Sequence, residues 1–189
     1  MNHHIPKIVC LVLFWGVLII SCKKSDPAPL GAQVNAKFLA GDKGKVKSWK
    51  LRELVFQSGT NPASTQTLPG CFADNLYTFS NNDAQAYAAT EGTTKCYNSD
   101  AIESGTWAFT LDGLRLNIEV DNTQSPNGLF SPEPTYAQDT VKKIIYPYNF
   151  GYSPYPAFVQ KLDDNNLILE INYIAGKQKY KYILTFTPA

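Results

Sequence analysis

Side chains able to do chemistry are few in this 189-residue sequence, and their spacing argues against a catalytic or metal site. Asp163 and Asp164 are adjacent, whereas calcium loops space their oxygen ligands, so "LDDNNL" predicts a hairpin turn. Glu103 and Glu119 give no identifiable acid and base pair, because sequence spacing does not fix the carboxylate separation that glycoside hydrolysis requires. The stretch "GDKGKVK", residues 41–47, lacks the GK[ST] ending of a phosphate-binding loop. We therefore predict no enzyme, no metal site and no cofactor.

The first residues have the pattern of a secretory signal peptide. Lys7 precedes 13 uncharged residues, Ile8–Ile20, "IVCLVLFWGVLII". A helix of that length spans about 20 Å, less than the roughly 30 Å hydrocarbon core of a bilayer. The short apolar run, its basic start and the small Ser21 predict a removable signal over residues 1–21. An ordinary cleaved signal and an uncleaved anchor helix remain the alternatives.

Cys22 stands where the apolar run meets a solvated segment. The residues "IISC" resemble the lipobox of bacterial lipoproteins. That resemblance implies that Cys22 is acylated, becomes the mature N-terminus and holds the protein on a membrane of the bacterial envelope, which we expect to be the outer membrane. The following "CKKSDP" has only Asp26 behind two lysines, rather than an acidic run, so the periplasmic or surface side stays open.

Removal of residues 1–21 would change what the composition allows. Both histidines, His3 and His4, lie in that segment, so the mature chain would lack the imidazole of Ser-His-Asp and Cys-His sites and of His-ligated zinc. Without Lys7 the 17 basic residues become 16, against 16 acidic residues. This balance does not predict a nucleic-acid partner.

Two further cysteines, Cys71 and Cys96, remain in the mature chain. In an oxidising envelope compartment they are predicted to form a disulfide. Two separate buried thiols are the alternative.

From Lys47 onward the sequence predicts short strands, and the 13% aromatic residues of the full chain favour them. "NLYTFS" and "QAYAAT" flank the turn cluster "NNDA" and predict a hairpin. Further strands are predicted at "GTWAFTL", "VKKIIYPY", "AFVQKL" and "LILEINYI", and residues 121–140 are predicted to be a long loop. Three strands show one apolar face each: Trp49, Leu51 and Val55; Leu114, Leu116, Ile118 and Val120; and Tyr180, Tyr182, Leu184 and Phe186.

Seven or eight short strands joined mostly by tight turns predict an all-β fold, an antiparallel up-and-down barrel that closes to remove its edges. The predicted organisation is a signal peptide at 1–21, a lipid-anchored tether and lead-in at 22–46, and the barrel domain at 47–189.

Residues 47–188 resemble the lipocalin-like lipoproteins of Bacteroidetes. The resemblance rests on Trp49 in an early strand and on "CFADNLYTF", "SGTWAFTLDGLRL", "NNLILEINY" and the terminal "YKYILTFTPA". It implies an eight-stranded lipocalin-like barrel that binds a small apolar or amphipathic molecule. Lys47 stands where the lipocalin G-x-W glycine would fall, and the last strand has no arginine to stack on the tryptophan.

Two binding surfaces are predicted. Inside the barrel, alternating strand faces point six rings inward as a possible pocket: Trp49, Trp107, Phe109, Tyr180, Tyr182 and Phe186. Outside, the proline-bearing stretch 146–158 offers a possible aromatic platform for a glycan or an envelope protein: Tyr146, Tyr148, Tyr152 and Tyr155. The alternative is a loop that packs its rings over one end of the barrel. An eight-stranded barrel can be hollow enough for one small ligand or filled by its own side chains, so both functions stay open.

Overall fold

The computed structural model describes residues 28–95, 100–123, 129–130, 157–175 and 177–189. In chain order the elements are α1 (Gly31–Ala40), β1 (Val46–Ser58), β2 (Ser64–Gln66), α2 (Gly70–Ala73), β3 (Leu76–Ser80), β4 (Ala86–Thr90), β5 (Ala101–Phe109), β6 (Arg115–Thr123), β7 (Ala157–Leu162), β8 (Leu167–Ala175) and β9 (Gln178–Pro188).

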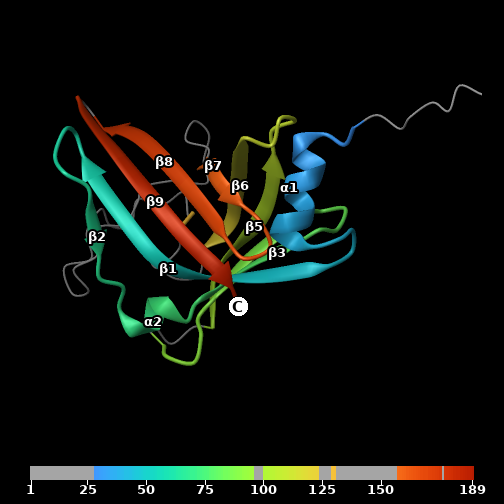
Figure 1. Cartoon of the computed structure of the whole chain (residues 1–189). Helices are drawn as coiled ribbons and strands as arrows, with labels where there is room; N and C mark the ends of the chain where they lie inside the picture. Colours follow the sequence, from blue (N-terminus) through green and yellow to red (C-terminus); the bar gives the residue numbers. More distant parts are fainter. Residues whose placement is uncertain (1–27, 96–99, 124–128, 131–156, 176) are drawn as a thin grey trace, which may run out of the picture.

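The strands form one antiparallel sheet in the order β2-β1-β3-β4-β5-β6-β7-β8-β9, which closes on itself because β1 also pairs with β9. Eight strands make the barrel, and β2 pairs with β1 only at Leu54–Phe56. This architecture confirms the predicted all-β, up-and-down, lipocalin-like barrel (Figure 1).

The barrel has two different ends. The β3–β4, β5–β6 and β7–β8 turns lie at one end, which we call the α1 end because α1 contacts β1, β3, β5 and β7 there. The opposite end, which we call the α2 end, holds α2, the end of β4, the start of β5, the end of β8 and the start of β9 (Figure 1). Strand alternation directs one face of every strand into the space between the two ends.

The interior is apolar and rich in rings. On β9, Tyr182, Leu184 and Phe186 are buried and Tyr180 is half-buried, as their alternation predicts. On β6, Leu116, Ile118 and Val120 are buried. Leu114 is 61% exposed, contrary to prediction, because it lies in the turn before β6 begins.

The predicted face of β1 is wrong after Leu51. Trp49, Leu51 and Leu54 are buried, whereas Val55 is only partly buried. The pairing with β9 shifts register between Leu51 and Glu53, so Arg52 is an extra residue in the strand. A bulge of this kind moves the following side chains to the other face, which brings Leu54 inward in place of Val55.

Helix α1 was not predicted, because residues 22–46 show little apolar periodicity. Its last turn enters the core, where Leu39 and Ala40 are fully buried. The Trp49 indole N–H donates a hydrogen bond to the Leu39 carbonyl at 2.8 Å, and this contact fixes the helix across the α1 end.

Lys47 joins three parts of the α1 end. Its Nζ donates to the carbonyls of Phe38 in α1 and Asp164 in the β7–β8 turn, both at 3.0 Å, and lies 4.2 Å from the centroid of the Trp49 ring. Burial lowers the pKa of Lys47, an effect that the carboxylates of Asp164 and Asp163 oppose. A cation therefore does lie on the face of this tryptophan, but it comes from the same strand and not from the last one.

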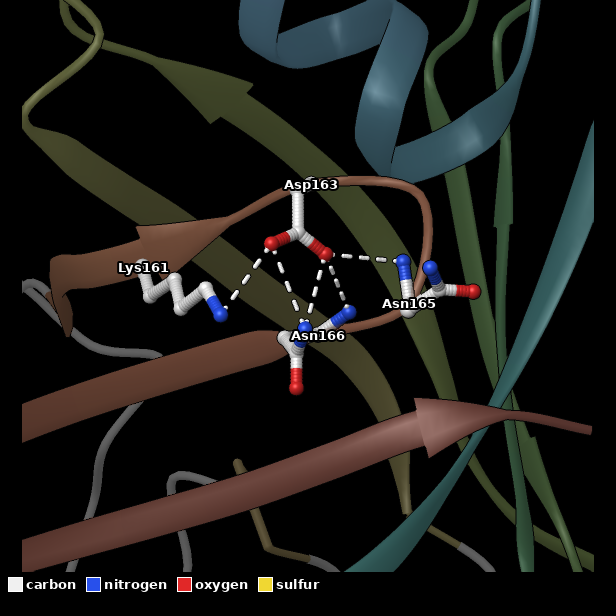
Figure 2. Close-up of polar contacts among 4 residues, drawn as sticks. All are labelled: Lys161, Asp163, Asn165 and Asn166. Atoms are coloured by element: carbon white, nitrogen blue, oxygen red, sulfur yellow. Dashed lines mark hydrogen bonds and ion pairs between the residues drawn. The ribbon is translucent and has the colours of Figure 1, made fainter.

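The β7–β8 turn confirms that "LDDNNL" is a hairpin turn (Figure 2). The Asp163 carboxylate accepts hydrogen bonds from the backbone N–H groups of Asn165 and Asn166, both at 2.8 Å, and from the Asn166 side-chain amide. Lys161 Nζ lies 3.3 Å from the same carboxylate. Within the described residues, no group of three or more His, Cys, Asp or Glu side chains is arranged to hold a metal ion.

These donors make the turn sensitive to acid. They lower the pKa of Asp163 from 3.8 to about 2, with the Asn166 side chain the largest cause and the Asn165 N–H the next. A carboxyl group whose pKa is lower in the folded than in the unfolded state stabilises the fold. This contribution is complete at pH values above the unfolded-state pKa and is lost as the pH falls through the folded-state pKa. We expect Asp163→Ala to destabilise the protein near neutral pH and to converge with wild type between pH 3.8 and about 2, measured by urea unfolding at stepped pH. Asp164→Ala is the matched control, and convergence of the same size in that variant would contradict the assignment.

Several predicted features lie outside the described residues. They are the signal peptide, Cys22, Cys96, the strand predicted at "VKKIIYPY" (residues 141–148) and the tyrosine platform at 146–155. The predicted loop at 121–140 begins too early, since β6 continues to Thr123. In the part of the chain that the structure describes, no helix is long and apolar enough to cross a membrane.

Candidate functional site

The barrel interior contains a cluster of polar side chains toward its α2 end. Asn75 is fully buried between α2 and β3, and Glu103 on β5 is 2% exposed. The hydroxyl-bearing rings of Tyr77 on β3 and Tyr87 on β4 are buried beside them, with exposures of 0% and 2%. These four buried polar side chains form the strongest candidate site, and we call them the polar cluster. Glu91, which is 6% exposed, is also buried, just past the end of β4, and is not counted among them.

Strand register places Tyr77 and Glu103 in one row. Tyr77 pairs with Ala89 of β4, and Ala89 pairs with Glu103 of β5. Neighbouring strands lie about 4.8 Å apart, so the tyrosine and the glutamate stand about 10 Å apart across the strand between them. Ala89 is the residue between them, and its single methyl group fills little of that space.

A bulge in β5 explains why a carboxylate points inward here. The pairing of β4 with β5 shifts register between Ala89 and Thr90, which leaves Ile102 as an extra residue. Ile102 and Glu103 are consecutive, yet both are buried. Glu103 lies on the same face of β5 as Trp107 and Phe109, the face that points into the barrel.

The Glu103 carboxylate is held by donors from two segments. The Tyr87 hydroxyl donates to Oε1 at 2.6 Å, and the backbone N–H of Phe130 donates to Oε1 and Oε2 at 3.2 and 3.3 Å. The Phe130 ring also packs edge-on against Tyr87, with centroids 5.7 Å apart. Glu103 therefore fixes the described residues that follow β6 against the inside of the barrel.

The other half of the cluster has unmet hydrogen-bonding capacity. The Tyr77 hydroxyl and both polar atoms of the Asn75 amide are buried without a hydrogen-bond partner among the described residues. The amide lies near enough to the hydroxyl to favour its ionised form slightly, but the two groups do not meet hydrogen-bond geometry. Buried polar groups in this state cost about 1–3 kcal/mol each unless a water or a ligand supplies the missing partner.

The electrostatic field of Glu103 disfavours a second negative charge in the polar cluster. Burial, and then the charge of Glu103, raise the pKa of Tyr77 far above its usual value. The same two causes, followed by the hydrogen bond to Glu103, raise the pKa of Tyr87. Both rings therefore stay protonated donors at neutral pH, and an anion beside Tyr77 would meet the same repulsion that opposes its ionisation.

The six predicted pocket rings belong to or pack against one hydrophobic core, but they contact different partners in it. Trp49 lies at the α1 end against Leu39, whereas Tyr180 and Tyr182 both contact Phe56, with centroids 6.0 and 4.9 Å apart. Trp107 packs edge-on against Phe109, and Phe186 packs edge-on against Tyr77. Phe109 and Tyr180 are half-buried and the other four rings are buried, so all six serve the core. That they line a cavity stays a prediction.

Sequence reasoning missed the polar cluster because it tested Glu103 only as a partner of Glu119. The structure shows that Glu119 is exposed on β6, opposite Thr106, so the two carboxylates face different sides of the sheet. The alternation of Glu103 with Trp107 and Phe109 in "ESGTWAF" was the available signal. A glutamate in phase with two core rings predicts a buried carboxylate.

Comparison with known proteins agrees with this geometry. Residues 46–130 match the family model of the lipocalin-like domain, a segment that runs from the start of β1 to Phe130 and includes the whole polar cluster. No curated protein matches the chain.

Proposed function

We propose that the protein is an envelope lipoprotein whose barrel binds a small amphipathic molecule without chemically altering it. A lipocalin-like barrel is a ligand-binding type of fold. The observation that carries the proposal is the pair of unpartnered buried groups, the Tyr77 hydroxyl and the Asn75 amide, beside the small Ala89. A ligand head group placed there would complete their hydrogen bonds, while the surrounding rings would contact its apolar part.

The cluster also indicates the class of head group. Tyr77 can donate one hydrogen bond, and the Asn75 amide can both donate and accept. A neutral hydroxyl, carbonyl or amide satisfies these groups without a net charge, whereas a carboxylate would face the field of Glu103 that already raises the pKa of Tyr77. We therefore propose a neutral amphipathic ligand, such as a long-chain alcohol or amide, in preference to a fatty acid.

Binding without catalysis fits the protonation of the cluster. Tyr77 and Tyr87 keep their protons at neutral pH, and Glu103 accepts hydrogen bonds from Tyr87 and Phe130. These groups are arranged as fixed donors and acceptors. General acid–base catalysis is most efficient when the pKa of the group lies near the working pH, and the raised pKa values of Tyr77 and Tyr87 lie away from it.

Anchoring of this binding domain is proposed from the sequence. The signal-like residues 1–21 and the lipobox-like "IISC" support acylation of Cys22 and attachment to a bacterial envelope membrane, with the outer membrane the expected one. The membrane side on which the barrel lies is left open.

Tyr77→Phe tests the site with two opposite effects. Removing the unpartnered hydroxyl should raise the free energy of unfolding by about 1 kcal/mol, because one buried polar group no longer lacks a partner. The same change should weaken binding of decanol about tenfold, the loss of about one hydrogen bond. Binding is measured on the mature chain by displacement of the neutral probe N-phenyl-1-naphthylamine, and stability by urea unfolding.

Tyr87→Phe is the matched control. It makes the same tyrosine-to-phenylalanine change, but the hydroxyl that it removes already donates to Glu103. This variant should lose about 1–2 kcal/mol of stability. Decanoate should compete less well than decanol against the wild type. Unchanged decanol affinity in Tyr77→Phe, or equal competition by both compounds, would refute the proposed site.

A further inference from the structure

Four large apolar side chains are exposed together at the α1 end. Leu30 and Val34 lie at the start of α1 with exposures of 51% and 38%, and Leu111 and Leu114 lie in the β5–β6 turn with exposures of 74% and 61%. We call these four residues the apolar rim. They account for four of the six exposed large hydrophobic side chains in the described part of the chain.

Direct contacts hold the helix and the turn together. The Ala32 N–H donates to the Leu111 carbonyl at 3.2 Å, and the Asn35 side chain donates to the Gly113 carbonyl at 2.8 Å. A Cβ on Gly31 would lie 2.1 Å from the Asp112 carbonyl oxygen, so the absence of a side chain allows this approach. The start of α1 and the turn therefore form one surface, and they lie side by side in Figure 1.

The spacing of the rim residues places their side chains close together on this surface. Leu30 and Val34 are four positions apart, which places them on the same side of the helix start. Leu111 and Leu114 project from the adjoining turn. Grouped exposed apolar residues of this kind mark a surface that contacts a protein or a membrane, whereas scattered single residues need no explanation.

The short connection to Cys22 favours a membrane, in preference to a protein, as the surface that the apolar rim contacts. Leu30 is eight residues from Cys22, and a fully extended chain of that length reaches at most about 28 Å. An acyl group on Cys22 would thus keep the apolar rim within that distance of the bilayer. Lys23 and Lys24, in the same connection, carry the charge that anionic lipid head groups attract.

We propose that the α1 end is the membrane-facing side of the barrel, with Leu111 and Leu114 inserted among the lipid head groups. Leu30 and Val34 lie beside them at the same interface. This inference rests on the proposed acylation of Cys22. It is independent of the proposed ligand site.

Tryptophan reporters at opposite ends of the barrel test the orientation. Leu111→Trp places a reporter in the rim, and Ile174→Trp places one at the α2 end, where the native side chain is 56% exposed. Each acylated mature variant, which begins at Cys22, is reconstituted into vesicles of phosphatidylethanolamine and phosphatidylglycerol with brominated acyl chains, which quench only nearby indoles. After subtraction of the wild-type signal of Trp49 and Trp107, we expect blue-shifted and quenched emission for Leu111→Trp and no quenching for Ile174→Trp.

Two readouts separate the orientation from the anchor. The intact mass of the purified protein reports acylation of Cys22, and circular dichroism reports that each variant is folded. An acylated, folded protein whose Leu111→Trp emission is not quenched, or is quenched no more than that of Ile174→Trp, would overturn the orientation and leave the anchor standing. An unmodified Cys22 would overturn the anchor and, with it, this inference.

Discussion

Trp49→Ala should lower the free energy of unfolding by about 3–5 kcal/mol, as expected when a large buried ring leaves a cavity. The indole is fully buried, donates to the Leu39 carbonyl and supports the Lys47 ammonium on its face. Its loss therefore removes core volume and a buried polar link between α1 and the barrel. Urea unfolding measures the stability, and amide hydrogen exchange over residues 31–40 should show faster exchange across α1.

Trp49→Phe separates the two contributions. Phenylalanine keeps much of the apolar contact but cannot donate to Leu39, so about 1–2 kcal/mol should be lost and α1 should exchange faster than in the wild type. If Trp49→Ala cost less than about 1 kcal/mol, or left exchange in α1 unchanged, the ring would not be the anchor that its contacts indicate.

The second large effect is expected at Cys71 and Cys96. A disulfide between them would stabilise the fold by about 3–4 kcal/mol on the chain-entropy account. Cys71 is buried in α2, and its neighbour Asp74 accepts a hydrogen bond from the Thr94 N–H at 2.9 Å. This contact brings the chain two residues before Cys96 close to α2, which supports the predicted pair.

The double variant Cys71→Ala, Cys96→Ala should lose this stability and become insensitive to dithiothreitol, while the wild type loses a similar amount on reduction. Peptide mapping of unreduced protein should recover the two cysteines in one linked fragment. Recovery of two unlinked thiols from unreduced protein would refute the pair, as would a reductant effect of the same size in both proteins.

The barrel could be predicted because short stretches of sequence specify its strands and turns. Period-two alternation marks the inner faces of β6 and β9, and turn residues mark the hairpins. The errors on β1 and at Leu114 arise at a bulge and at a strand end, where one residue changes which face is buried. Helix α1 escaped prediction because only its last turn is buried, at Leu39 and Ala40, and so its sequence carries no full apolar stripe.

The candidate site was harder to predict, because it depends on register between strands. Tyr77, Ala89 and Glu103 become neighbours through two pairings and a bulge that the sequence does not display. Each of the six aromatic candidates is inward or half-buried, yet sequence alternation cannot say which end of the barrel a ring occupies. The unpartnered state of Tyr77 and Asn75 appears only when the side chains around them are in place.

The pairing of β1 with β9 has a consequence for how the chain folds. All the other pairings in the barrel join barrel strands that follow one another along the chain. By contrast, Trp49–Ser58 must meet Tyr180–Pro188, at the far end of the sequence. Contacts of such long sequence separation carry the largest loop-closure entropy and slow folding. During synthesis β1 emerges early, but its partner is the last strand to appear. Until β9 arrives, Leu51 and Leu54 lack their cross-strand neighbours Phe186 and Leu184, so a chain shortened before β9 would present two open strand edges, on β1 and on β8, to other chains.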